Sequence, residues 1–104
     1  MMNYQYIADL ATEVEIPTEG ILTRTIYQDD RVKAVIFGFD VGQELSEHTA
    51  SMPAILSMIQ GEAKITLAED ILEVEAGAWI HMDAQLPHSI QAKTPVIMLL
   101  LLLK

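Results

Sequence analysis

Residues Gly42 to Gly61 read GQELSEHTASMPAILSMIQG, and this stretch contains the most informative pattern of the sequence. A second stretch, Gly77 to His88, reads GAWIHMDAQLPH and follows the same plan. Each stretch begins with a glycine, continues with residues typical of a strand and contains a histidine, which is His48 in the first and His88 in the second. Two histidines that come from different strands and face one interior would begin a metal site.

Short apolar and β-branched runs, separated by turn residues, continue on both sides of these stretches. Such runs fit a pleated, half-buried surface, and their spacing of about 8–12 residues predicts an all-β sandwich or barrel of about nine strands. The predicted strands are Ile21–Tyr27, Arg31–Val41, the run from Gly42 to His48, Ala54–Gln60, Ala63–Leu67, Ile71–Glu75, Ala78–Met82, Pro87–Ala92 and Val96–Leu103.

The chain length of 104 residues predicts a single domain with one core. Residues 1–20 have a mixed composition and form an N-terminal segment, in which Tyr4 to Val14 is either a short helix or an edge segment. The barrel is expected over about residues 21–103.

The last predicted strand, Val96–Leu103, is apolar throughout and lacks the alternation of a half-exposed strand. Both of its faces must therefore be covered, because an exposed apolar strand of this length would aggregate. Either it lies centrally between two sheets, or one face forms a subunit interface, and we expect a homodimer. The run is far shorter than the roughly 20 residues of a membrane-spanning helix.

Composition narrows the classes of partner. Fifteen acidic against six basic residues give a net charge of −9, which argues against nucleic acid or an anionic membrane as a partner. Cysteine is absent from the sequence, so disulfides and thiolate metal sites are excluded. Met1 to Leu10 show no basic start and no apolar run typical of a signal peptide, and we expect a cytoplasmic protein.

The two histidine stretches resemble the paired motifs of the cupin superfamily, which consists of small double-stranded β-helix (jelly-roll) barrels. The first cupin motif runs from a glycine through His-x-His and Glu to a glycine, and Gly42, His48 and Gly61 stand in register with it. The second runs from a glycine through Pro-x-Gly to a histidine, and Gly77 and His88 stand at that spacing. The resemblance is to small single-domain cupins with a conserved barrel and implies a jelly-roll fold.

The departures from these motifs bear on function. Ala50 and Ala54 stand where the first motif has its second histidine and its glutamate, and Asp83 and Gln85 replace the proline and glycine of the second motif. The resemblance therefore implies only two metal ligands, His48 and His88, for an ion such as Zn, Fe, Ni or Mn.

A catalytic metal usually has about three protein ligands, so a further one is needed. It would come from a neighbouring subunit or from a side chain of this chain. The candidates in this chain are Gln43, Glu44, Glu47 and His81.

Alternation along the strands predicts what surrounds the two histidines. If His48 points inward, so does Ala50, and if Ala54 points inward, Leu56 and Met58 do as well. The predicted ligand pocket is thus apolar. Its predicted residues are Ala50, Ala54, Leu56, Met58 and His81, although His81 has the alternative of bonding to a backbone carbonyl. Trp79 is expected in the core or at an interface, with a place on the wall of a ligand pocket as the alternative.

Three functions follow from this pattern. The first is binding of a small molecule in an apolar pocket, with His48 and His88 orienting a polar group of the ligand. The second is a metal-dependent enzyme of the oxygenase or isomerase type, acting on a small organic acid or a sugar-like substrate, as the resemblance implies. The third is a non-catalytic structural or regulatory domain that acts through its dimer surface.

Overall fold

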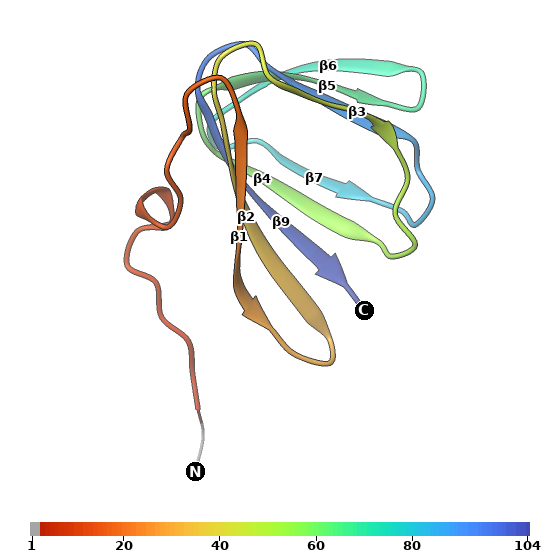
Figure 1. Cartoon of the computed structure of the whole chain (residues 1–104). Helices are drawn as coiled ribbons and strands as arrows, with labels where there is room; N and C mark the ends of the chain where they lie inside the picture. Colours follow the sequence, from red (N-terminus) through yellow and green to blue (C-terminus); the bar gives the residue numbers. More distant parts are fainter. Residues whose placement is uncertain (1–2) are drawn as a thin grey trace.

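The computed structural model describes residues 3–104, and Met1 and Met2 of the predicted N-terminal segment lie outside the described residues (Figure 1). The prediction of an all-β fold with about nine strands is confirmed. The elements are η1 (Leu10–Thr12), β1 (Ile21–Gln28), β2 (Val32–Phe39), β3 (Glu44–His48), β4 (Ala54–Gln60), β5 (Glu62–Leu67), β6 (Asp70–Glu75), β7 (Trp79–Met82), β8 (His88–Ala92) and β9 (Val96–Leu103).

The strands form two antiparallel sheets that pack face to face. One has five strands in the order β1-β2-β9-β4-β7, and the other has four in the order β3-β8-β5-β6. Figure 1 shows the two layers close together at one end and apart at the other. Within residues 3–104 the sheets are not joined by a backbone ladder, so the predicted jelly roll is a two-layer sandwich and not a ring of hydrogen-bonded strands.

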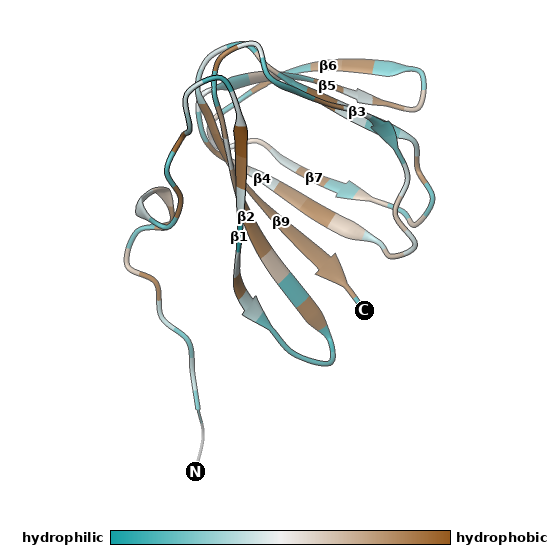
Figure 2. Ribbon diagram, viewed as in Figure 1, coloured by the Kyte–Doolittle hydropathy of each residue, from teal (hydrophilic) through white to brown (hydrophobic). Residues whose placement is uncertain are grey.

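The core lies between the sheets because apolar residues recur at every second position of the strands. Phe39 and Met98 from the five-stranded sheet and Ile65 and Ile90 from the four-stranded sheet are buried in one cluster. Figure 2 shows the hydrophobic stretches concentrated on β2, β4 and β9. Within residues 3–104, no helix is long and apolar enough to cross a membrane.

The position of β9 in the sheet explains why its sequence does not alternate between apolar and polar residues. It lies between β2 and β4, so it is the central strand of its sheet. Met98 points into the core between the sheets, whereas its neighbour Ile97 points to the opposite face and packs in a second buried cluster with Val14. Both faces of β9 are therefore buried at this end, as its apolar run predicts.

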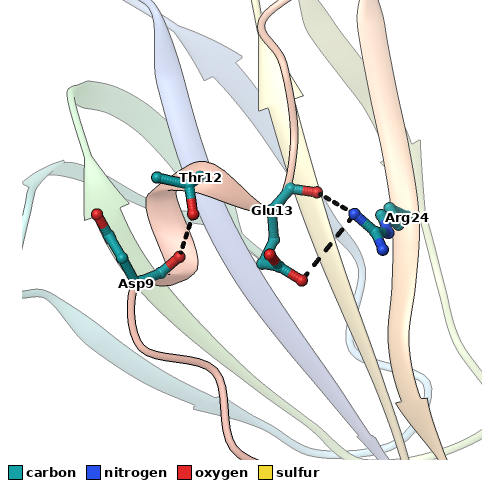
Figure 3. A network of polar contacts seen from close by, with 4 residues as sticks. All are labelled: Asp9, Thr12, Glu13 and Arg24. Carbon is teal, nitrogen blue, oxygen red and sulfur yellow. Dashed lines mark hydrogen bonds and ion pairs between the residues drawn. The ribbon is translucent and has the colours of Figure 1, made fainter.

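The N-terminal segment covers this part of the outer face. Its helix is a single 3₁₀ turn, Leu10–Thr12, and Asp9 caps it by accepting a hydrogen bond from the backbone N–H of Ala11. Arg24 of β1 donates a hydrogen bond to the carbonyl of Glu13 over 3.3 Å and lies 4.0 Å from its carboxylate (Figure 3). These contacts hold residues 9–13 against the sheet.

The segment then crosses β2 at Gly38. A Cβ at this position would lie 2.6 Å from the backbone oxygen of Glu15, which is closer than side-chain atoms pack. Glycine here allows the segment to lie directly on the sheet.

Candidate functional site

His48 and His88 come from neighbouring strands of the four-stranded sheet. β3 and β8 pair antiparallel, and His48 lies directly opposite His88 in their register. The two imidazole rings have centroids 4.2 Å apart and are tilted by 58°. The structure therefore brings together the two histidines that stand 40 residues apart in the sequence.

A β-bulge produces this pairing. Leu45 of β3 lies opposite Ile90 of β8, and both pack in the core, but the register then shifts before His48 pairs with His88. Without the shift, alternation would place His48 on the face opposite to Leu45, because the two are three positions apart. The bulge adds one residue to β3 and so turns His48 to the same face as His88.

Both rings are fixed through the same ring nitrogen. His48 Nδ1 lies 2.8 Å from the carbonyl oxygen of Ser46, and His88 Nδ1 lies 2.8 Å from that of Leu86. A carbonyl oxygen only accepts hydrogen bonds, so each Nδ1 carries a proton. Each neutral ring then has its lone pair on Nε2, which is free to accept a hydrogen bond or to bind a metal.

The histidines form one wall of a cavity of about 210 Å³ between the sheets. His88 is buried, with 8% of its surface exposed, and His48 is exposed at the rim. The facing wall comes from the five-stranded sheet and from the loops at the same end, and it is mostly apolar. The cavity is lined by His48, Ala50, Met52, Ala54, Met82, Asp83, His88, Leu100 and Leu102.

The predicted pocket residues divide into two groups. Ala50 and Ala54 line the cavity. Leu56 and Met58 point inward as alternation predicts, but they are 1% and 2% exposed and lie in the packed core. Within the described chain the cavity wall does not include Leu56, Met58 or His81.

His81 faces away from the cavity. On β7, Met82 is buried and lines the cavity, so alternation turns His81 to the outer face. The His81 side chain is 44% exposed, and its Nδ1 lies 3.9 Å from a carboxylate oxygen of Asp83. Trp79, two residues earlier on the same face, is 63% exposed, so the alternative that it fills the core is wrong.

Five of the lining residues are not predicted from the sequence as pocket residues, and these are Met52, Met82, Asp83, Leu100 and Leu102. For Leu100 and Leu102 the missing information is the pairing of β4 with β9, which sets Leu102 opposite Ala54. In the sequence, Asp83 stands out only as a departure from the second motif, but its position before the turn to His88 brings it to the cavity.

The predicted candidates for a third metal ligand lie outside the cavity wall. Glu44 and Glu47 are exposed, and Gln43 is half-buried outside the cavity wall. Asp83 lines the cavity, but its side chain is 90% exposed. Among residues 3–104, no group of three or more His, Asp and Glu residues is arranged to hold a metal ion.

The loop that carries Asp83 is tied to the loop after His48. The backbone N–H of Gln85 donates a hydrogen bond to the carbonyl of Ala50 over 2.8 Å. Gln85 has φ of 68°, in the left-handed region that favours glycine, and it stands where the second motif has its glycine. Gln85 thus adopts a conformation that glycine favours, at the position where the motif has a glycine.

Comparison with solved structures found close matches over nearly the whole chain. A conserved protein of unknown function from Streptococcus pyogenes matches with 31% sequence identity and a TM-score of 0.87, over 99% of this chain and 90% of that chain. A cupin superfamily protein from Desulfitobacterium hafniense matches with 25% identity and a TM-score of 0.88, over 98% and 94%. A cupin 2 conserved barrel domain protein from Leptotrichia buccalis matches with 28% identity and a TM-score of 0.84, over 91% of this chain and 46% of that chain.

A scan against protein-family models found no match, and a search of curated proteins found none either.

Proposed function

This chain belongs to the cupin superfamily, and on that premise we propose that it binds a small, mostly apolar molecule carrying one hydroxyl group. The apolar part of the ligand occupies the cavity between the sheets, and its hydroxyl group lies against His48 and His88. One observation carries this proposal. Two imidazoles that are fixed through Nδ1 lie 4.2 Å apart on one wall of a cavity that is otherwise mostly apolar.

The histidines favour a hydroxyl group over other head groups. Each Nε2 lone pair accepts a hydrogen bond, and a hydroxyl group is the smallest neutral donor that uses one. A carboxylate would need a protonated ring, and it would approach a chain of net charge −9 with the Asp83 carboxylate at the mouth of the cavity. A neutral ligand avoids this repulsion.

The volume and the walls limit the rest of the ligand. An apolar cavity of about 150 Å³ is sufficient for benzene, so about 210 Å³ accommodates one ring with a short substituent. A sugar carries hydroxyl groups on every side, and those facing Ala54, Leu100 and Leu102 would lose their hydrogen bonds to water without compensation. A single-ring alcohol fits both the size and the polarity.

A divalent metal ion is the other occupant that the histidine pair suggests. The donor set does not complete a metal centre, because His48 and His88 supply two ligands where about three are usual. Asp83 is the remaining titratable residue on the cavity wall, and its carboxylate is solvent-exposed beside His81. These residues do not fit a Zn, Fe, Ni or Mn centre of ordinary composition, and we derive no metal-dependent step.

Benzyl alcohol is therefore expected to raise the melting temperature of the protein purified without a histidine tag. At a concentration about ten times its dissociation constant the shift should be about 6–7 °C. Replacing His48 and His88 by alanine removes both Nε2 atoms that can accept the one hydrogen bond of the hydroxyl group, and it should raise the dissociation constant about tenfold. Differential scanning fluorimetry over a concentration series of benzyl alcohol measures both effects.

The chain provides a matched control. His81→Ala removes the one histidine that faces away from the cavity, so benzyl alcohol should bind this variant as it binds the wild type. Toluene, which lacks the hydroxyl group, should bind more weakly, and EDTA should leave the benzyl alcohol shift unchanged. Equal shifts with toluene and benzyl alcohol, or a shift with glucose alone, would contradict the proposal. The absence of any shift would favour the structural function instead.

A further inference from the structure

The inner face of the five-stranded sheet carries a lysine beside the cavity. The strand registers set Lys33 of β2 opposite Leu102 of β9, and Leu102 opposite Ala54 of β4. Residues directly opposite in an antiparallel pair point to the same face of the sheet. Because Leu102 and Ala54 line the cavity, Lys33 lies on the cavity side of the sheet, one strand beyond the cavity wall.

A lysine at this position is unusual, because the surrounding face is apolar. The next residues on the same face, Val35 of β2 and Leu56 of β4, are both buried. Lys33 is the one charged residue that the described strands place on this face, and it is half-buried. Within residues 3–104, the lysine side chains that make ion pairs or hydrogen bonds are Lys93 and Lys104. The ammonium group of Lys33 is therefore available to a ligand.

Basic residues gather at this end of β2 although the chain is acidic. Three of the six basic residues, Arg31, Lys33 and Lys104, lie here, and the backbone N–H of Lys104 donates a hydrogen bond to the carbonyl of Arg31 over 2.8 Å. Only two of the fifteen acidic residues, Asp29 and Asp30, lie in the same turn. The Asp29 carboxylate accepts hydrogen bonds from backbone N–H groups of that turn. This end of the sheet thus favours an anion more than the rest of the chain does.

The acidic residue of the cavity lies on the opposite side. Asp83 follows β7, which is three strands from β2 and therefore about 14 Å away. This separation exceeds the Debye length of about 8 Å at physiological ionic strength. Asp83 therefore repels an anionic group against the histidines more strongly than an anionic group beside Lys33.

We propose that Lys33 binds a carboxylate at the end of the ligand opposite to its hydroxyl group. This inference rests on the proposed binding of an alcohol in the cavity, and it gives that alcohol a second polar end. The hydroxyl group lies against His48 and His88 of the four-stranded sheet, and the ring occupies the apolar cavity. The carboxylate lies at the β2 side, where the ammonium group of Lys33 donates a charge-assisted hydrogen bond. The ligand class is then a hydroxy acid with an apolar ring between its two polar groups.

The dimensions of the site agree with such a ligand. The cavity of about 210 Å³ holds the ring and a short substituent, so the carboxylate lies outside the enclosed volume. Figure 1 shows the start of β2 and the end of β9 at the end where the two layers are apart. Packed sheets are about 10 Å apart, and a ring with substituents at opposite positions spans most of that distance. 4-(Hydroxymethyl)benzoate has this arrangement and differs from benzyl alcohol only by its carboxylate.

NMR titrations with 4-(hydroxymethyl)benzoate and with benzyl alcohol test the role of Lys33, at about pH 8, where imidazole is ordinarily neutral. The wild type should bind the acid about three- to tenfold more tightly than the alcohol. Lys33→Met keeps the apolar stem and removes the charge. It should weaken binding of the acid about three- to tenfold and change binding of benzyl alcohol less than about twofold. Lys33→Arg should retain the preference for the acid, and about 0.5 M NaCl should reduce it in the wild type.

Lys64→Met is the matched control. Lys64 is also half-buried, but its neighbours Ala63 and Ile65 point into the core, so Lys64 lies on the outer face of the four-stranded sheet. This variant changes the net charge by the same amount as Lys33→Met and should leave both dissociation constants unchanged.

The outcomes separate this inference from the proposed function. If benzyl alcohol binds but Lys33→Met and Lys64→Met show the same preference for the acid, the role of Lys33 is overturned and the proposed function stands. Failure of both compounds to bind the wild type would overturn the proposed function and this inference with it. Binding of the acid alone, with its loss in Lys33→Met, would support the carboxylate site and contradict binding driven by the hydroxyl group.

Discussion

Replacing Gly61 by alanine is expected to lower the free energy of unfolding by about 3–5 kcal/mol. Gly61 has φ of 89°, which an alanine adopts only with strain. An added Cβ would also overlap the backbone oxygen of Pro95 and lie 2.8 Å from the hydroxyl oxygen of Thr94. The hydroxyl group of Thr94 accepts a hydrogen bond from the backbone N–H of Glu62 and donates one to the carbonyl oxygen of Pro95, so a shift of either group would disturb these bonds. The expected loss is a large share of the roughly 5–15 kcal/mol that stabilises a domain of this size.

The two other glycines of the histidine stretches separate backbone strain from the steric clash. Gly42 and Gly77 have φ of 80° and 98°, but an added Cβ would meet no atom within 4 Å at either position. Gly42→Ala and Gly77→Ala should therefore cost only about 1–2 kcal/mol each. Urea unfolding followed by circular dichroism, at one protein concentration for all variants, measures the three values. Equal costs at all three glycines would show that Gly61 does not lie close to Pro95 and Thr94.

Leu56→Ala is expected to lower the free energy of unfolding by about 2–5 kcal/mol, because Leu56 is 1% exposed in the packed core. The same substitution should leave benzyl alcohol binding nearly unchanged, since Leu56 lies outside the cavity wall. Urea unfolding and fluorimetric titration with benzyl alcohol report the two quantities separately.

Met52→Ala is the matched comparison for this prediction. Met52 lines the cavity and is only half-buried, so its truncation should cost less than about 1.5 kcal/mol of stability but change the binding of benzyl alcohol. A Leu56→Ala variant that keeps its stability but binds benzyl alcohol differently would show that Leu56 lines the cavity.

The strands and the apolar character of the fold could be predicted from local sequence. Period-two patterns, glycine turns and the apolar run of β9 indicate where each strand lies, because a strand with one buried face has an apolar residue at every second position. The run at Val96–Leu103 required two covered faces, and the structure covers Ile97 with the N-terminal segment. The sequence could not indicate that this cover ends before Leu99.

The depth and direction of the site residues could be predicted only in part. Alternation correctly predicts that Leu56 and Met58 point inward. Whether an inward residue lines the cavity or lies in the packed core depends on how far apart the two sheets are at that position, and no local sequence pattern gives this separation. His48 faces its partner because of a bulge between Leu45 and His48, and a bulge reverses the alternation on which the prediction rests. His81 has the residue type of a site residue, but it lies beside the buried Met82 on a strand too short for its facing to be read from the sequence.

The resemblance to the two cupin motifs added what local patterns could not. It related His48 to His88 across 40 residues of sequence, and the register of β3 and β8 sets them side by side. Ala50 and Ala54 stand where the motif has metal ligands, and both residues line the cavity. An apolar wall replaces the missing ligands, and this change underlies the proposed binding of a small apolar alcohol.

The arrangement of the two imidazoles is tested most directly by NMR of the protein labelled with ¹⁵N at its histidines. Long-range ¹H–¹⁵N correlations identify which nitrogen of each ring carries the proton, and ring-to-ring nuclear Overhauser effects report on proximity. The hydrogen bonds to Ser46 and Leu86 predict that the neutral rings of His48 and His88 are both protonated on Nδ1, with strong effects between the two rings. Rings protonated on Nε2, or rings that show no mutual effect, would contradict the account.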